Sequence, residues 1–315
     1  MNPSLKENER DTNGRTGARR GPAAAVLLTA DGVRLRAVHY PARSAPGGEL
    51  AGGGGSVETA VVLAHGFSGA LSRPGVRRIA AALSTEFGVV TFSFRGHGTS
   101  GGRSSVGDRE VLDVDAAVSW ARSLGYRRIV TVGFSMGAAV VLRHAALCRG
   151  LPGRTDAAAA VSSPGRWYYK GTRPMRLLHW AVQRPEGRLF SRWVLGTRIA
   201  RDWEVVPMPP RIAAREAAEA GVPLLIVHGD ADRYFPLAHG TSLHEATGGR
   251  AELWVEPGMG HAENAVGEEL LARLAGWLRR AVLATGAGAR VPSAPDHRGP
   301  SGPQETKAGK AGGRA

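Results

Sequence analysis

Apolar and polar residues alternate along the chain in two recurring patterns. Short, continuous apolar runs predict buried strands, and longer stretches with apolar residues on one face predict amphipathic helices. Strands are expected at residues 59–64, 88–94, 128–132, 157–162, 222–228 and 251–255, and helices at 73–86, 107–124, 136–148, 237–246 and 265–283. This repetition predicts an α/β fold, a mostly parallel, doubly wound sheet with helices on both faces.

Two segments depart from this repetition. Residues 23–29 and 33–40 are β-like and flank Asp31-Gly32, a strong turn signal, so a hairpin is expected there. Between about 164 and 220 no strand-like run occurs, and four of the seven tryptophans gather in that stretch. We interpret it as a helical insertion that forms a cap on the α/β domain.

The ends of the chain differ in composition from its middle. Residues 1–22 are polar and rich in Gly and Arg, and residues 285–315 are rich in Gly, Ala, Pro and Lys. Both segments are predicted to be disordered, the second as a basic tail. We therefore expect one α/β domain at residues 23–284, with the cap insertion at about 164–220.

Composition limits the classes of protein to consider. Hydrophobic residues make up 43% of the chain and charged residues 22%, which suits a globular domain. The net charge of +14 reflects either a compositional bias towards Arg or attraction to anionic partners, but no nucleic-acid-binding module is recognisable. With one cysteine, Cys148, no intrachain disulfide can form, and no apolar run reaches the ~20 residues of a membrane span. A cytoplasmic protein without an integral membrane segment is expected.

A candidate nucleophile follows the apolar run at residues 130–132. The sequence Gly133-Phe134-Ser135-Met136-Gly137 leads from that predicted strand directly into an Ala/Val/Leu-rich predicted helix. Strand, sharp turn and helix in this order lift the Ser135 hydroxyl out of the sheet. Gly133 and Gly137 are expected because side chains there would collide with the neighbouring strand and helix.

Two competing motifs lie in one glycine-rich loop. Gly98-Thr99-Ser100-Gly101-Gly102 also matches Gly-x-Ser-x-Gly, but no apolar helix follows it directly. Residues 96–101 formally match the dinucleotide-binding pattern, yet no helix opens at the third glycine. The histidines show no convincing metal-ligand spacing. We therefore expect neither a cofactor nor a metal.

A nucleophilic serine needs a base and an orienting carboxylate. Asp232 and His261 follow the predicted strands 222–228 and 251–255, so both belong at the same sheet edge as Ser135. Their order along the chain, Ser, Asp, His, is that of α/β-hydrolases. Asp230 competes for the acid role, but Asp232 lies deeper in its loop and is the preferred candidate.

An oxyanion hole requires two backbone N–H groups. Met136 supplies one because it directly follows the nucleophile. The loop after the predicted strand 59–64, His65-Gly66-Phe67, is expected to supply the other through Phe67, while Gly66 lets the backbone approach closely.

These motifs together resemble the α/β-hydrolase superfamily, in particular its serine aminopeptidase-like and monoglyceride-lipase-like branch. The matching pieces are His65-Gly66-Phe67, Arg95-Gly96-His97-Gly98-Thr99-Ser100, Gly133-Phe134-Ser135-Met136-Gly137, His228-Gly229-Asp230-Ala231-Asp232 and Gly260-His261. The resemblance implies a cofactor-free serine hydrolase that acts through an acyl-enzyme, with the insertion as its cap.

The expected function is hydrolysis of carboxylic esters, with acyl-ester or monoacylglycerol-like substrates. Thioesterase and serine peptidase activities remain open because the same machinery serves them, and a non-catalytic binding protein is the rival from another class. The aromatic cap fits a small apolar substrate, although its tryptophans could equally serve only to pack the cap onto the core. Neither the natural substrate nor the oligomeric state follows from the sequence.

Overall fold

A computed structural model describes residues 21–43, 58–150, 153–201 and 206–287. The predicted disorder of residues 1–22 and 285–315 falls almost wholly outside these ranges. Residues 44–57, which include a run of four glycines, also lie outside them. None of the described helices combines the length and the apolar content that a bilayer-spanning segment requires.

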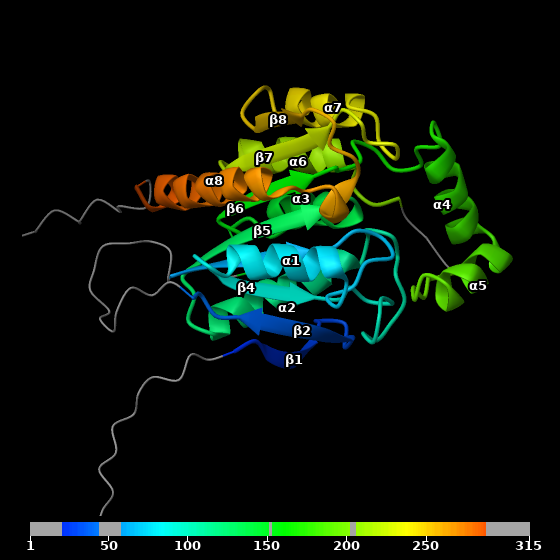
Figure 1. The fold of residues 1–315 in the computed structure, drawn as a ribbon, viewed down its shortest axis with the longest axis horizontal. Helices are drawn as coiled ribbons and strands as arrows, with labels where there is room; N and C mark the ends of the chain where they lie inside the picture. The colour runs from blue at the N-terminus through cyan, green and yellow to red at the C-terminus, as the bar shows by residue number, and fades with distance from the viewer. Residues whose placement is uncertain (1–20, 44–57, 151–152, 202–205, 288–315) are drawn as a thin grey trace, which may run out of the picture.

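The centre of the fold is an eight-stranded sheet in the order β1-β2-β4-β3-β5-β6-β7-β8 (Figure 1). β1 and β2 form the predicted hairpin, β2 also pairs antiparallel with β4, and the remaining pairs are parallel. The sequence-based expectation of a mostly parallel sheet is confirmed. The strands are β1 (Ala23–Leu28), β2 (Arg34–Tyr40), β3 (Thr59–Ala64), β4 (Gly88–Phe92), β5 (Arg128–Phe134), β6 (Ala157–Val161), β7 (Leu224–Gly229) and β8 (Glu252–Glu256).

The central strands are predominantly apolar because both faces of the sheet are covered. Side chains alternate between the faces, so Val61 and Leu63 of β3 join one core cluster while Ala60 and Val62 join another. Helices α1 (Pro74–Leu83) and α8 (Glu268–Ala287) cover the first face. Helices α2 (Glu110–Ser123), α3 (Met136–Leu147), α6 (Pro210–Glu219) and α7 (Ala238–Ala246) cover the other (Figure 1). The result is the doubly wound, three-layered α/β fold that the hydrophobic pattern predicts.

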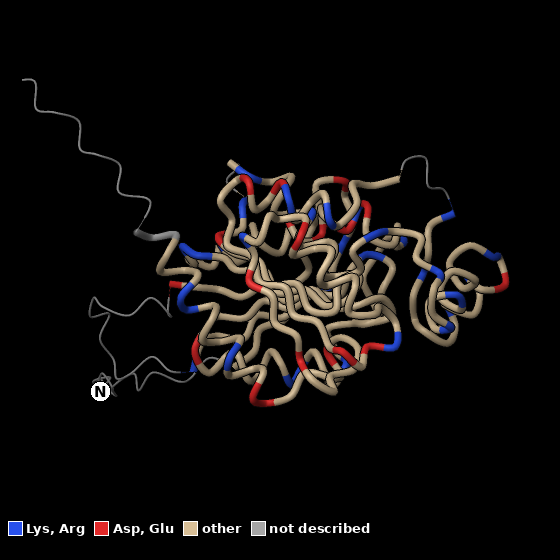
Figure 2. Tube along the Cα trace, turned by 90° about the horizontal axis from the view of Figure 1, so that it is seen from above, with Lys and Arg blue, Asp and Glu red and all other residues tan. Residues whose placement is uncertain are grey.

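The segment between β6 and β7 divides into two parts. Helices α4 (Arg173–Gln183) and α5 (Pro185–Trp193) stand apart from the layered body, as Figure 1 shows. Helix α6 instead packs its buried alanines against α3 and the sheet. The part that can act as a cap is therefore α4–α5, which is narrower than the insertion expected at residues 164–220. Arginines recur along both cap helices, with Glu186 as their one acidic residue (Figure 2).

Candidate active site

Ser135 occupies a strained turn between β5 and α3. Its backbone has φ 52° and ψ −114°, a conformation that residues other than glycine rarely adopt. A Cβ atom on Gly133 would overlap the carbonyl group of Gly137, and one on Gly137 would overlap the carbonyl oxygen of Ala64. The chain can therefore make this close turn only with glycine at both positions, as expected from the sequence.

A continuous hydrogen-bonded relay leads from Ser135 into the protein. His261 Nε2 lies 2.9 Å from Ser135 Oγ, and His261 Nδ1 lies 2.8 Å from Asp232 Oδ2. The Asp232 side chain is fully buried, whereas 15% of the His261 side chain is exposed. The structure thus brings together the three residues that sequence analysis selects from three separate strand ends.

The surroundings of Asp232 favour its ionised form. Burial alone would raise the pKa of this carboxyl, but hydrogen bonding and charge interaction with His261, together with backbone hydrogen bonds, outweigh burial, so the pKa is lowered. The backbone N–H groups of Phe235 and Tyr234 contribute by donating to Oδ1 at 3.0 and 2.8 Å. Asp230 has a different place, because its Oδ1 accepts the N–H of Gly258 at 2.7 Å.

The two proposed oxyanion donors flank Ser135. Phe67 and Met136 line the same cavity as Ser135, and Met136 begins helix α3. Within the part of the chain that the structure describes, neither backbone N–H has a hydrogen-bond acceptor. The N–H groups at a helix N-terminus have no intrahelical partner, and the positive end of the helix dipole favours negative charge there.

His65 fixes the loop that carries Gly66 and Phe67. Its Nε2 accepts the N–H of Phe94 at 3.1 Å, so the ring proton must sit on Nδ1, which donates to the Gly66 carbonyl oxygen at 2.7 Å. Burial, assisted by the neighbouring His97, lowers the pKa of His65 to about 3. His65 is therefore a neutral support for the loop, a role that fits its place in the predicted motif.

Two supporting residues, Tyr234 and Ser162, were missed by the sequence analysis, and His228 was named there only as part of a matching motif. The Tyr234 ring stacks on the His261 ring with centroids 4.3 Å apart. The Ser162 hydroxyl accepts the N–H of Ala262, directly after His261, at 3.0 Å. Buried His228 bonds through Nε2 to the Phe235 carbonyl oxygen at 2.9 Å. The Tyr234 and Ser162 contacts join segments distant in sequence, whereas His228 and Phe235 are seven residues apart. Only the position of Ser162 and His228 at strand ends could have drawn attention to them.

Comparison with known proteins assigns the family. A model of the alpha/beta hydrolase family matches residues 61–274. The chain belongs to this family. A search of curated proteins finds no match for the hydrolase.

Solved structures with a similar fold include two esterases and a serine hydrolase. An esterase of Pyrococcus furiosus is 23% identical, and the match covers 82% of this hydrolase and 92% of that chain with a TM-score of 0.61. An esterase domain from Rhodothermus marinus is 20% identical over 82% of this chain and 98% of that one, with a TM-score of 0.56. A serine hydrolase without a lid from Xanthomonas campestris is 22% identical over 87% and 97%, with a TM-score of 0.53. At such identities the likeness establishes a shared fold.

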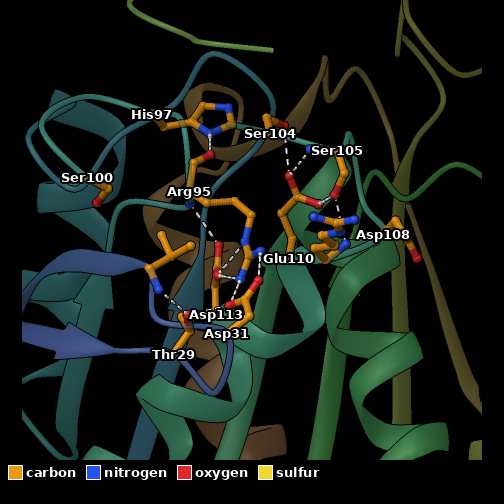
Figure 3. Close-up of polar contacts among 12 residues, drawn as sticks. Thr29, Asp31, Arg95, His97, Ser100, Ser104, Ser105, Asp108, Glu110 and Asp113 are labelled. Carbon is orange, nitrogen blue, oxygen red and sulfur yellow. Dashed lines mark hydrogen bonds and ion pairs between the residues drawn. The ribbon is translucent and has the colours of Figure 1, made fainter. Parts of the chain in front are cut away.

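The loop after β4 connects the core of the hydrolase to its cap. Arg95 is buried between Asp31 and Asp113, with hydrogen bonds of 2.6 Å and 2.8 Å to their carboxylates (Figure 3). Further along the loop, the hydroxyls of Ser104 and Ser105 donate to the buried carboxylate of Glu110, the first residue of α2, at 2.8 and 2.7 Å. Isolated β-bridges then join His97 to Thr197 and Ser104 to Ile199. This loop therefore contacts the residues that follow α5, where the chain leaves the cap.

One group of potential metal ligands occurs among the described residues, away from Ser135. Ligand atoms of Asp115, His144 and Cys148 lie within 4.8 Å of one another. His144 is nine residues beyond Ser135 on α3, which corresponds to about 13 Å along the helix axis. A metal at this group could not touch the Ser135 hydroxyl.

Two cavities meet at Ser135. The small cavity, of about 130 Å³, lies beneath α4 and is lined by Met136, Trp167, Tyr169, Val182 and Phe235. The large cavity, of about 910 Å³, is lined by Arg73, Arg173, Leu177, Tyr234, His261 and Glu263. Both cavities are lined by Phe67, Ser135, Met175 and Leu178. A molecule bound across Ser135 would therefore extend into each cavity.

Proposed function

We propose that this hydrolase cleaves small apolar carboxylic esters through an acyl-enzyme formed on Ser135. The observation that carries the proposal is the relay of 2.9 and 2.8 Å from Ser135 through His261 to Asp232. The motif resemblance to the serine aminopeptidase-like and monoglyceride-lipase-like branch, and the esterases among the structural neighbours, support the same reaction class.

The first half of the reaction forms the acyl-enzyme. Ser135 Oγ attacks the ester carbonyl carbon while His261 Nε2 accepts the hydroxyl proton. Asp232 keeps the other ring proton on Nδ1 and stabilises the imidazolium that results. The carbonyl oxygen becomes an oxyanion, to which the backbone N–H groups of Phe67 and Met136, two residues that line the cavity at Ser135, donate in this proposal. The intermediate collapses when His261 returns its proton to the alcohol oxygen, and the alcohol leaves.

The second half restores the enzyme. A water molecule enters the position left by the alcohol and attacks the acyl carbon, and His261 accepts its proton. When the second tetrahedral intermediate collapses, the same proton passes to Ser135 Oγ, and the carboxylic acid is released. No redox or metal step is required, so the residues described here balance the whole reaction.

Labelling with a fluorophosphonate probe tests the proposal. The probe phosphorylates an activated serine, and peptide mass mapping then identifies the modified residue. We expect labelling of the wild type at Ser135, no labelling of Ser135→Ala, and no label on Ser100 of the competing motif. Ser100 Oγ already donates to the Ser93 carbonyl oxygen at 2.7 Å and is buried. A folded wild type that neither reacts with the probe nor hydrolyses para-nitrophenyl butyrate would overturn the proposed function.

A further inference from the structure

The position of His261 orients an ester across Ser135. If the proposed function holds, His261 must deliver a proton to the leaving alcohol oxygen, so the alcohol has to lie on the His261 side of the reacting carbon. His261 lines only the large cavity, and Met136, with its free N–H, lines only the small one. The acyl group therefore belongs in the small cavity and the alcohol in the large one.

The two cavities differ several-fold in size. About 130 Å³ is close to the volume of an engineered apolar protein cavity, about 150 Å³, that binds benzene. The acyl cavity therefore suits a compact acid of roughly four to six carbons. Trp167, Tyr169 and Val182 surround it, and the guanidinium of its one arginine, Arg166, lies 5.6 Å from the Tyr169 ring centroid.

The large cavity carries unneutralised positive charge. Arg73 and Arg173 line it, and among the described residues neither forms an ion pair. The Arg73 guanidinium donates one long hydrogen bond, of 3.5 Å, to the Ser68 carbonyl oxygen. The buried Glu263 carboxylate on the same wall faces the Gly66 N–H at 3.4 Å and opposes this charge in part. Two arginines against one carboxylate favour an anionic group on the alcohol.

We propose that the substrate is an ester of a compact apolar acid with a larger alcohol that carries an anionic group. The small cavity selects the acid by volume, and Arg73 and Arg173 select the alcohol by charge. Val182, which lines only the small cavity and is 8% exposed, is a residue that limits acyl length.

Isomeric esters test the size assignment without changing overall hydrophobicity. Octyl butyrate has a short acid and a long alcohol, and butyl octanoate has the reverse arrangement. We expect kcat/KM for octyl butyrate to exceed that for butyl octanoate by at least about tenfold. Val182→Ala should narrow this preference by enlarging the small cavity, whereas Leu177→Ala, which alters only the large cavity, should not. Equal rates for the two isomers, or faster cleavage of butyl octanoate, would overturn the assignment.

Charged leaving groups test the role of the arginines. We expect the wild type to prefer para-sulfophenyl butyrate over para-trimethylammoniophenyl butyrate. Arg173→Ala should reduce this ratio of kcat/KM values about two- to fivefold, as for an exposed charge pair. Arg176→Ala is the matched control, because Arg176 is on the same helix and lines neither cavity. An unchanged ratio in Arg173→Ala, or an equal change in Arg176→Ala, would refute the charge assignment.

Fluorophosphonate labelling separates failure of this inference from failure of the proposed function. If Ser135 is labelled and simple esters are hydrolysed, but neither size nor charge preference appears, the assignment of the cavities is wrong and the hydrolase chemistry stands. If Ser135 is not labelled and no ester is hydrolysed, the proposed function itself fails, and the inference that rests on it fails as well.

Discussion

Replacement of Asp232 by asparagine changes hydrogen bonding and charge at the relay with almost no change in size. In the wild type, Asp232 Oδ1 accepts the backbone N–H groups of Tyr234 and Phe235, while Oδ2 faces His261 Nδ1 at 2.8 Å. The asparagine oxygen must take the Oδ1 position, because an NH₂ group there would face two donors. The NH₂ group then faces His261 Nδ1 and donates to it, which places the ring proton on Nε2.

This tautomer removes the general base. A protonated Nε2 cannot accept the Ser135 proton, although the distance between the two atoms need not change. The corresponding aspartate-to-asparagine change in a serine-protease triad lowers kcat about ten-thousandfold. We expect a loss of similar size in Asp232→Asn, which corresponds to about 5.4 kcal/mol of activation free energy. Steady-state hydrolysis of para-nitrophenyl butyrate measures kcat, and thermal unfolding shows whether the variant remains folded.

Asp230→Asn is the matched control for this experiment. Asp230 lies in the same loop and accepts the Gly258 N–H, a bond that an amide oxygen can keep. Its kcat should stay within about twofold of the wild type. A folded Asp232→Asn variant that retains more than about a tenth of wild-type kcat would refute the tautomer argument. Equal losses in both variants would instead point to a general disturbance of the loop.

Three further predictions concern stability and reactivity. Gly137→Ala should destabilise the fold by about 2–3 kcal/mol because its Cβ overlaps backbone, whereas Gly276→Ala in α8 should be neutral or stabilising by up to about 1 kcal/mol. Urea unfolding measures the stability of both variants, and equal effects would contradict the close-packing argument. Hydrogen bonding from Arg95 lowers the pKa of Asp31 to about 2, so its stabilisation is complete above about pH 4 and lost as pH falls through 2. In Asp31→Asn, the free energy of unfolding should lose about 1 kcal/mol of its change with pH, allowing for 33% exposure of the Asp31 side chain. A variant whose free energy of unfolding changes with pH as much as that of the wild type would contradict the ion pair. Burial raises the pKa of Cys148 to about 11, so a disulfide reagent should modify Cys148 slowly in the folded protein at neutral pH and rapidly in the urea-unfolded protein. Similar rates of modification in the two states would refute the effect of burial on this thiol.

The hydrophobic pattern predicts most of the fold because the central strands are buried on both faces. Strand β3 is found at the predicted residues 59–64, and the antiparallel hairpin forms around Asp31-Gly32 as its turn residues indicate. Helix α6 is harder to assign from sequence, since its buried face consists of alanines that carry little hydrophobic signal. Helix α8 begins at Glu268 rather than near residue 265, because residues 262–264 first form a 3₁₀ turn after His261.

The candidate site could be predicted only as far as its residues follow strand ends. Ser135, Asp232 and His261 do so, and the topology of a parallel sheet is sufficient to gather them at one edge. The stacking of Tyr234 and the support from Ser162 depend on how loops pack after the chain has folded. Cavity volume and the placement of the cap arginines likewise arise from packing between α4 and the sheet edge, for which no local pattern exists.

The structure separates the proposed chemistry from substrate selection. The Ser135 turn, the His65 loop and the His261 loop are each fixed by buried contacts to the sheet or to neighbouring loops. Much of the wall of both cavities comes instead from α4, on which Leu177, a lining residue of the large cavity, is 61% exposed. The closely packed Ser135 turn and the His65 and His261 loops tolerate few substitutions, whereas exposed positions tolerate many. Changes in the cap should therefore alter which ester is cleaved while leaving the reactivity of Ser135 toward a small phosphonate intact.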